Sequence, residues 1–498
     1  MTAGRPPCRA LLVLVAVTAQ VHAEGRPRYG GTVEGALLSA PVSLDPAAAS
    51  VHAELVCVDL VFDTLYRVGP EGIVHPHLAL ALPEVTKDRV RIRLRKDVRF
   101  HDGSTLTGQD VVASLERVRT TPARWALAPV SSIRADAEGV ELVLKAPAPE
   151  LAALLALPAT AVTKGGKAVG ARPVGSGPFA VGAFDPRTRR LQLDAFDGHF
   201  AGRPYLDRLV LRWYDAPDAE ARQFEKGDAQ LSARGAAAFT GAQPKYRAED
   251  VEGPAALLVY IGFGRAHAAV TADRAFRRAL DLAIARSALA SVGSGERVAP
   301  TRTPIPVEAG AAPLAPSARA DDLPNAKLAL GEAAKRVKAL EPSRLGQLKL
   351  EILVEDTRPD DREVAERIAY ALTKLGIAST ITGVSAATLR DRVRRGDTDL
   401  WIGQLAAPVT SPTAWWGGAF AAGSDLWVEQ RLSAGALDGR AAARAFEERR
   451  PIIPLVFRAV RIWHRSDVHG VRFDGSGRPS YADLFLFGDP VRSQGGRP

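Results

Sequence analysis

The sequence predicts an α/β protein built from more than one lobe. The chain has 498 residues, which is more than one hydrophobic core usually fills. Its composition, 46% hydrophobic and 24% charged, is typical of a folded globular protein. In the second half, apolar strands at 348–355, 377–384 and 398–405 alternate with amphipathic helices at 360–376 and 386–395. This β-α-β-α-β order predicts a mostly parallel sheet covered by helices.

The first element is a predicted secretory signal. Arg5 and Arg9 precede an apolar run at 10–19, and Val21-His22-Ala23 places small residues before a cleavage point. We therefore expect residues 1–23 to be removed and the mature chain to be exported. Cys8 precedes the apolar run, whereas a lipidated cysteine would follow it, so we expect no lipid anchor.

Cleavage leaves Cys57 as the single cysteine. This excludes an internal disulfide and a cluster of thiolates. Cys57 lies in the apolar stretch LVCVDLVF, which favours a buried, unreactive thiol. The formal charge is +9, but basic residues are scattered among acids, so we expect no nucleic-acid binding.

The first half alternates short strands and helices. A strand begins after Gly31, and apolar residues at helical spacing predict a helix in ELVCVDLVFDTLYRV. Val90, Ile92 and Leu94 alternate with arginines, which predicts a half-buried strand. Thr107 three residues before Asp110 predicts a capped helix. Further strands are expected at 139–147, 189–196, 206–214 and 257–264, and helices at 149–158 and 218–231.

In the second half, Phe276, Leu280 and Ile284 lie four apart and predict a helix over 273–289. A proline-rich connector at 300–324 follows, and then another helix near 325–340. Gly376 is a natural C-cap for the helix before it. The motif PIIPL at 451–455 begins a tail rich in strands.

Several polar motifs could suggest chemistry. His101-Asp102 could act as an acid–base pair, but adjacent residues of a strand point to opposite faces. A turn in which Asp102 caps amides and Gly103 adopts a positive φ is the better interpretation. His75-Pro76-His77 offers half of a usual metal site without a ligating neighbour, so we expect no metal. No nucleophile elbow, zinc-protease motif or phosphate loop is present, which argues against an enzyme.

An ordered series of motifs resembles one family. These motifs are GGT, SLDP, LVFDTLYR, VRIRLRKDVRFHDGSTLTGQDVVASLERV, GSGPF, AFRRALDLAIAR and PIIPL. They occur in the order seen in family 5 extracellular solute-binding proteins, the peptide/nickel-type binding components of bacterial ABC importers. The resemblance implies a bilobed periplasmic-binding-protein fold. Lobe I would span 24–255 with a subdomain at about 67–168, lobe II would span 256–454, and 455–498 would return to lobe I.

The resemblance also implies a function. The mature protein would be a periplasmic monomer that encloses a peptide or similar small polar solute between its lobes and delivers it to an ABC permease. No cofactor is implied. Two alternatives remain open: a sensor or interaction protein on the same scaffold that does not transport, and a secreted hydrolase.

The predicted ligand contacts depart from the family at one loop. Many members carry Trp-x-x-Asp-x-Asp-Pro after the strand that reads TDLWIGQL here, whereas this chain has Gln404 or Leu405 at the tryptophan position and Ala407 and Thr410 at the acids. Arg265 could meet a carboxylate, although a solvated arginine is the alternative. Trp415 and Trp416 lie in a predicted Gly- and Ala-rich loop, with core packing as the alternative. The predicted ligand-binding set is Pro41, Ser43, Trp125, Arg265, Gln404, Thr410, Trp415 and Trp416.

Overall fold

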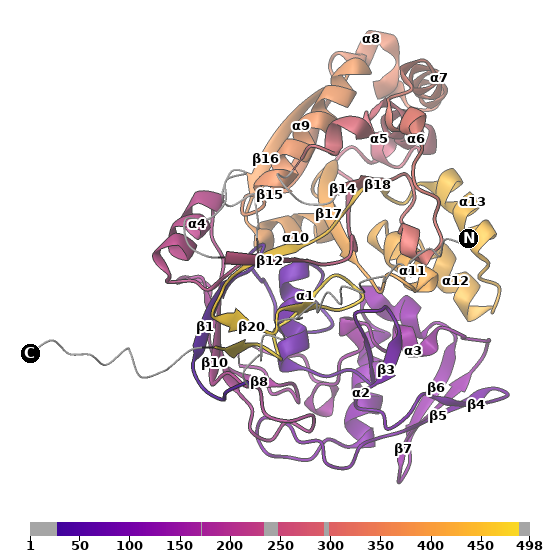
Figure 1. Ribbon diagram of the computed structural model, residues 1–498. Coiled ribbons are helices and arrows are strands. Elements are labelled where there is room, and N and C mark those ends of the chain that lie inside the picture. Colours follow the sequence, from indigo (N-terminus) through magenta and orange to yellow (C-terminus); the bar gives the residue numbers. More distant parts are fainter. Residues whose placement is uncertain (1–26, 171, 234–247, 293–297, 488–498) are drawn as a thin grey trace, which may run out of the picture.

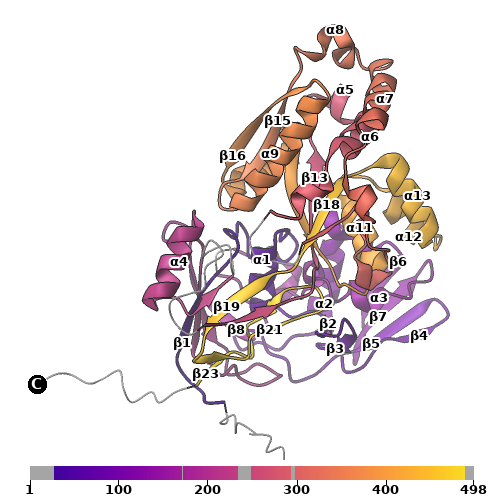
Figure 2. The same cartoon turned by 45° about the horizontal axis from the view of Figure 1, so that its top comes forward.

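The computed structural model describes residues 27–170, 172–233, 248–292 and 298–487. Two large sheets, one in each lobe, organise the chain (Figures 1 and 2). The predicted signal peptide and Cys8 lie outside the described residues. Among the described residues, no helix is both long and apolar enough to cross a membrane.

Lobe I is built on a seven-stranded mixed sheet in the order β12-β19-β11-β1-β10-β9-β8. Its central strand β1 pairs in parallel with β10 and β11, and the other neighbours are antiparallel. The helix α1 (His52–Val61) packs on it, with Cys57 fully buried. The strands are β1 (Thr32–Ala36), β8 (Phe179–Asp185), β9 (Arg190–Ala195), β10 (Arg208–Arg212), β11 (Leu231–Ser232), β12 (Ala248–Glu252) and β19 (Arg461–Arg465).

A four-stranded antiparallel sheet, in the order β4-β5-β7-β6, forms a subdomain on lobe I. Helix α2 (Gly108–Val118) covers it, and Thr107 and Asp110 form the predicted capping box. The strands are β4 (Glu84–Thr86), β5 (Arg89–Arg93), β6 (Val130–Ala135) and β7 (Gly139–Leu144). Smaller elements are β2 (Tyr66–Val68), β3 (Val74–Pro76), α3 (Leu151–Leu154), α4 (Pro217–Lys226), β20 (Val468–His469), β21 (Arg472–Phe473), β22 (Pro479–Ser480) and β23 (Phe485–Leu486).

The turn at His101-Asp102-Gly103 has the structural role that its residues predict. Asp102 accepts from the amide of Ser104 and pairs with Lys164, and Gly103 has a φ of +83°. The His101 ring contacts the backbone of the GSGPF turn instead, with 3.0 Å from Nε2 to the carbonyl oxygen of Gly177. The two side chains do not meet each other, so this motif is scaffold.

Lobe II is built on a six-stranded sheet in the order β14-β18-β13-β17-β15-β16. Strand β15 pairs in parallel with β16 and β17, but β13 and β18 insert as antiparallel strands. The sheet is therefore mixed and not mostly parallel, because strands far apart in the sequence complete it. The strands are β13 (Leu257–Phe263), β14 (Val298–Pro300), β15 (Lys349–Glu355), β16 (Ala378–Val384), β17 (Leu400–Ala406) and β18 (Ile453–Arg458).

Helices cover both faces of this sheet (Figure 2). One face packs on α6, α7 and α9 around Phe276 and Ile368, and the other packs on α11 and α13. The helices of lobe II are α5 (Ala268–Thr271), α6 (Arg274–Ala283), α7 (Leu323–Ala334), α8 (Pro342–Leu345), α9 (Pro359–Lys374), α10 (Ala386–Arg395), α11 (Pro412–Ala422), α12 (Trp427–Ser433) and α13 (Gly439–Arg449).

Two short crossings join the sheets. Residues 253–256 connect β12 to β13, and residues 459–460 connect β18 to β19. The boundary expected between 454 and 455 falls inside β18, which pairs with lobe II over its whole length. Both crossings join lobe II at the same end of its strands, where β13 begins and β18 ends. We call this end the edge of the sheet that faces lobe I.

The segment with Trp415 and Trp416 was predicted as a loop, and this is wrong. It forms helix α11, with Ser411 as the N-cap and Pro412 in the first turn. Small residues let the helix pack closely, since a Cβ built on Gly417 would lie 2.1 Å from the ring of Trp125. The glycines here serve close packing and do not break the helix.

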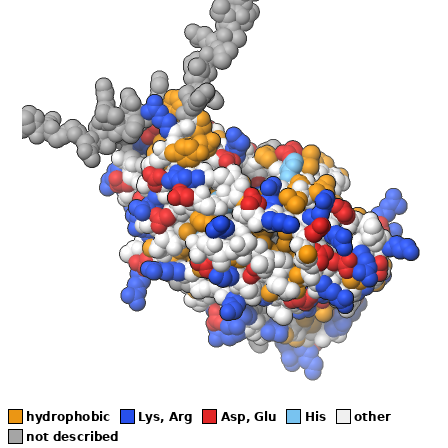
Figure 3. Space-filling model, turned by 90° about the horizontal axis from the view of Figure 1, so that it is seen from below, with side chains coloured by type: hydrophobic (Ala, Val, Ile, Leu, Met, Phe, Trp, Pro, Cys, Tyr) orange, Lys and Arg blue, Asp and Glu red, His pale blue; other side chains and the backbone are white. Residues whose placement is uncertain are grey.

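On the face seen in Figure 3, lysine and arginine side chains are interspersed with aspartate and glutamate. This face carries no broad area of a single sign. The mixture agrees with the scattered charges of the sequence.

Candidate ligand site between the lobes

Arg358 lies at the edge of the lobe II sheet that faces lobe I. It follows the carboxyl end of β15 and precedes α9, and its residue is only 6% exposed. Its Nε lies 2.9 Å from Glu355, and its Nη2 lies 3.1 Å from Asp361. Its Nη1 is buried and has no hydrogen-bond partner among the described residues. The guanidinium therefore keeps one open donor, although Glu355 and Asp361 already balance its charge.

Charges from neighbouring elements surround Arg358. Asp360 accepts a hydrogen bond of 2.7 Å from Arg458, which ends β18. Burial raises the pKa of the Asp361 carboxyl to about 6, although Arg358 opposes this shift. The edge thus holds two guanidinium groups and three carboxyl groups, counting Glu355, and all of them except Asp360 are largely desolvated.

Glu54 is a buried charge of lobe I that contacts lobe II. Its carboxylate is fully buried and accepts from the backbone amides of Val42, Ser43, Ser50 and Val51. This network fixes the turn that contains Pro41 and Ser43. Arg390 of α10 reaches across from lobe II and pairs with the same carboxylate, so α1 and α10 are linked where they approach each other (Figure 1).

The loop after β17 makes a second set of contacts with lobe I. Thr410 donates a 2.6 Å hydrogen bond to the carbonyl oxygen of Gly72, and the amide of Val409 donates to Gly475 at 2.8 Å. Ser411 and Thr413 both donate to Glu150. The Thr410 hydroxyl therefore has a partner in lobe I.

A third contact between the lobes involves Trp125, which lies in the 3-10 helix Pro122–Leu127. Its ring packs on Gly417 of α11 and is 7% exposed. Beside it, Arg124 pairs with Glu429 of α12 at 2.9 Å. A cavity of about 380 Å³ beside Trp125 lies between the lobes. A larger cavity, of about 540 Å³, lies elsewhere in lobe II.

The structure brings together some of the residues predicted to contact ligand and not others. Pro41, Ser43, Trp125 and Thr410 lie where the lobes meet. Gln404 is half-buried on β17, opposite Val259 of β13, near the same sheet edge.

The other three lie elsewhere. Trp415 is fully buried and donates from Nε1 to the carbonyl oxygen of Pro408, and Trp416 packs against Phe446. Arg265 follows the opposite end of β13 and donates to the carbonyl oxygen of Arg395, at the C-terminus of α10.

Sequence inspection missed Glu54, Arg358 and Arg390. Arg358-Pro359 before a helix was a usable signal, since proline in the first helical turn fixes the helix start and the preceding side chain lies at a strand end. No local sequence pattern marks Glu54 and Arg390, because they pair with each other across 336 positions of the chain.

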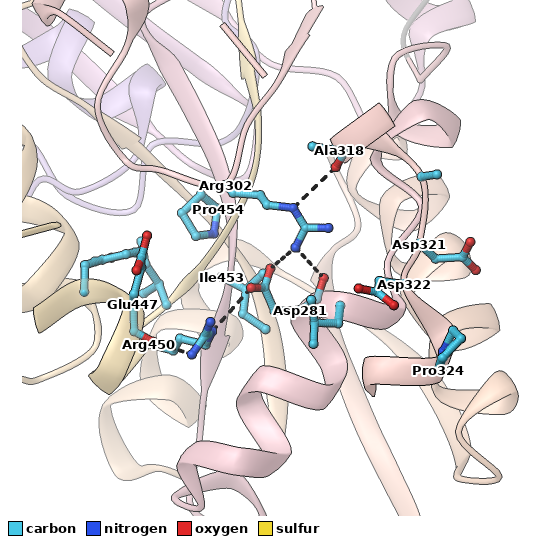
Figure 4. A pocket seen from close by; sticks show the side chains of 14 residues that line it. Asp281, Arg302, Ala318, Asp321, Asp322, Pro324, Glu447, Arg450, Ile453 and Pro454 are labelled. Carbon is cyan, nitrogen blue, oxygen red and sulfur yellow. Dashed lines mark hydrogen bonds and ion pairs between the residues drawn. The ribbon is translucent and has the colours of Figure 1, made fainter. Parts of the chain in front are cut away.

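The larger cavity is lined by residues of lobe II, between 281 and 454 (Figure 4). Asp281 lines this cavity and pairs with Arg302 and Arg450, which also line it. Asp281 pairs in addition with Arg286, which is not part of the lining. The charges of this cavity are thus largely satisfied within the protein. We assign it a structural role.

The pair between Arg390 and Glu54 gives a first prediction. Replacing Arg390 with Ala should weaken this contact between the lobes by about 1.5–3 kcal/mol, the value of a hydrogen bond to a charged group. Small-angle scattering of the ligand-free protein should show a larger radius of gyration. Arg394→Ala, on the same helix but paired with Asp391, is the control. An unchanged radius would show that the pair does not hold the lobes together.

A family model places the chain among known proteins. The model described as "Bacterial extracellular solute-binding proteins, family 5 Middle" matches residues 74–424, which is more than half of the chain. The chain belongs to this family. The resemblance found in the ordered motifs is thereby confirmed.

Curated relatives match parts of this family 5 protein. Protein XP55 of Streptomyces lividans is 30% identical over 268 residues, which cover 50% of this chain and 48% of that protein. YhjP of Bacillus subtilis, an uncharacterized protein, is 33% identical over 172 residues, 34% of this chain and 29% of its own length. The matched segments thus span less than half of these relatives.

Solved structures show the same bilobed fold along nearly the whole chain. DppA from Helicobacter pylori, in complex with the peptide STSA, superposes with a TM-score of 0.77 at 19% identity, covering 92% of this chain and 98% of that one. AppA from Bacillus subtilis, in complex with a nonapeptide, gives 0.76 at 18% identity, with 93% and 100% covered. NikA from Staphylococcus aureus, in complex with Ni(L-His)2, gives 0.74 at 18%, with 92% and 100% covered. DppA and AppA are binding proteins.

Proposed function

We propose that this protein is the periplasmic binding component of an ABC importer and encloses a small carboxylate-bearing solute, such as a peptide, between its lobes. The observation that carries the proposal is Arg358, a buried guanidinium at the lobe junction with an unused Nη1 donor. Such a group binds a carboxylate through charge-assisted hydrogen bonds. The peptide complexes of DppA and AppA support this ligand class.

The rest of the site would limit the ligand. Trp125 lines a cavity of about 380 Å³ between the lobes, a size that suits a small molecule, although Arg358 does not line this cavity. Ala407 and Thr410 stand where an acid would pair with a peptide ammonium group, and Thr410 already donates to Gly72. We therefore propose a ligand that is held mainly through its carboxylate end and does not need an ammonium partner at this loop.

Binding would act by stabilising the closed form. The two crossings at 253–256 and 459–460 are short enough to serve as a hinge. A ligand that contacts both lobes favours closure only through its differential affinity for the closed form. Closure would present a distinct surface to the permease.

Native mass spectrometry of the mature chain, purified without denaturation, tests the ligand class directly. A co-purified carboxylate-bearing molecule, together with a ligand-linked decrease in the radius of gyration, is the expected result. Pools of peptides, opines and metal chelates serve as titrants if nothing co-purifies. The proposal is wrong if none of these pools causes closure.

Delivery to a permease needs a separate test. Addition of liganded protein to the cognate permease in proteoliposomes should stimulate ATP hydrolysis. Binding without stimulation would instead support a sensor role on the same scaffold.

A further inference from the structure

A cluster of three potential metal ligands lies in lobe I, apart from the lobe junction. Asp63 follows α1, His77 follows β3, and His199 lies in the turn between β9 and β10. The three are 1%, 8% and 8% exposed. One ligand atom from each lies within 4.8 Å of the others. His75, the other histidine of the motif, is not part of this cluster and pairs with Glu71.

The hydrogen bonding of His199 leaves one ring nitrogen open. Its Nδ1 lies 3.2 Å from the carbonyl oxygen of Gly202, which can only accept, so Nδ1 carries the hydrogen. A carbonyl that holds this tautomer is typical of a histidine that ligates a metal. The Nε2 atom is buried and has no hydrogen-bond partner among the described residues.

This open nitrogen faces the Asp63 carboxylate. The distance from Nε2 to Oδ2 is 3.7 Å, too long for a hydrogen bond. In the neutral ring, a lone pair then faces a carboxylate oxygen in a desolvated site. Either a proton on Nε2 or a metal ion between the two atoms would remove this repulsion. The spacing is close to the separation of two ligand atoms on one ion.

The other contacts orient the carboxylate and the second histidine. The Oδ1 atom of Asp63 lies 2.7 Å from Nε2 of His77 and 3.2 Å from Nη2 of Arg67, and Ser176 donates to Oδ2 at 2.9 Å. Because the carboxylate only accepts, Nε2 of His77 carries the hydrogen in this contact. The side chain of Arg67 is 38% exposed and can turn toward solvent.

We propose that Asp63, His77 and His199 bind a divalent transition-metal ion, with Zn²⁺ as the ion that fits this donor set. Two imidazole nitrogens and one carboxylate oxygen, each about 2.0–2.2 Å from the ion, match known zinc sites. Tetrahedral ligand atoms would then lie roughly 3.3–3.5 Å apart. The His199–Asp63 distance would contract by a few tenths of an ångström. The hydrogen that Nε2 of His77 donates to Asp63 would move to Nδ1, so that Nε2 could ligate, and the His77–Asp63 distance would increase.

The ion would join three segments that are distant in the sequence. It would connect the end of α1, the hairpin of β2 and β3, and the turn between β9 and β10. Its role would be structural and independent of the solute bound between the lobes.

Isothermal titration of the full mature chain, stripped with EDTA and titrated with ZnCl2, tests this site. We expect one ion per chain with micromolar or tighter affinity, and a melting temperature that rises by a few degrees on zinc addition. His199→Ala should weaken binding at least 100-fold. A crystal of the zinc-loaded protein should show an anomalous peak within about 2.3 Å of the three ligand atoms.

His75→Ala is the matched control, because His75 is exposed, is two residues from His77 and lies outside the cluster. This variant should bind zinc as the parent does. His199→Ala must melt like the parent in EDTA, and if it does not fold, the anomalous peak in the parent decides alone. The proposal is overturned if the stripped parent does not bind zinc at 100 μM ZnCl2, or if His75→Ala alone abolishes binding.

Discussion

Replacing Arg358 with Gln lowers the affinity for a carboxylate-bearing ligand by about 30-fold or more. Loss of one partner from a buried, hydrogen-bonded charge pair costs about 2–5 kcal/mol. In this protein the guanidinium is 6% exposed and lies at the lobe junction, so solvent screens it little. Isothermal titration with the co-purified ligand, or with the tightest member of the peptide pool, measures the change.

Two further variants separate a binding role from a structural one. Arg358→Lys keeps the charge but loses the planar pair of donors, so it should retain part of the affinity. Arg265 lies at the opposite end of β13 and donates to the C-terminus of α10. The Arg265→Ala variant should therefore bind the carboxylate-bearing ligand with the affinity of the parent. If Arg358→Gln unfolds at the urea midpoint of the parent and still binds normally, Arg358 is not a ligand contact.

Replacing Asp281 with Ala should cost about 3–5 kcal/mol of stability in lobe II. Asp281 pairs with Arg286, which is 0% exposed, and also with Arg302 and Arg450 (Figure 4). Removing the carboxylate would leave a buried guanidinium without its counter-charge. The urea midpoint of the lobe II transition, followed by tryptophan fluorescence, should fall clearly.

The matched control is Asp391→Ala. Asp391 pairs with Arg394 and Arg395 on one exposed face of α10. Exposed ion pairs contribute about 0–1 kcal/mol, so this midpoint should barely move. Equal effects of the two substitutions would contradict the proposed importance of burial.

The helix cap, the turn at Gly103 and several helices and strands could be predicted from the sequence, because each depends on residues close together in the chain. The capping box of Thr107 and Asp110 involves atoms three residues apart, and the turn at Gly103 needs a positive φ that glycine provides. Apolar spacing located α6 and the strands of the β-α-β-α-β segment. The order of motifs then identified the family, since order is itself a property of the sequence.

Helix α11 shows where local signals failed. Its glycines suggested a loop around Trp415 and Trp416, since glycine lowers helix propensity. The folded protein needs a small residue at Gly417 because the Trp125 ring packs there. Both tryptophans of α11 are buried by packing against Phe457 and Phe446.

The local elements, the family and the expectation of two lobes follow from the amino-acid sequence alone. Which charges meet depends on how the chain folds: Arg390 pairs with Glu54 across the lobes, Arg358 lies at the sheet edge, and His199 faces Asp63. Helical and strand periodicity specify which face of an element is buried, but not which distant element covers it. These contacts join residues separated by as many as 336 positions, and their geometry arises only when the sheets assemble.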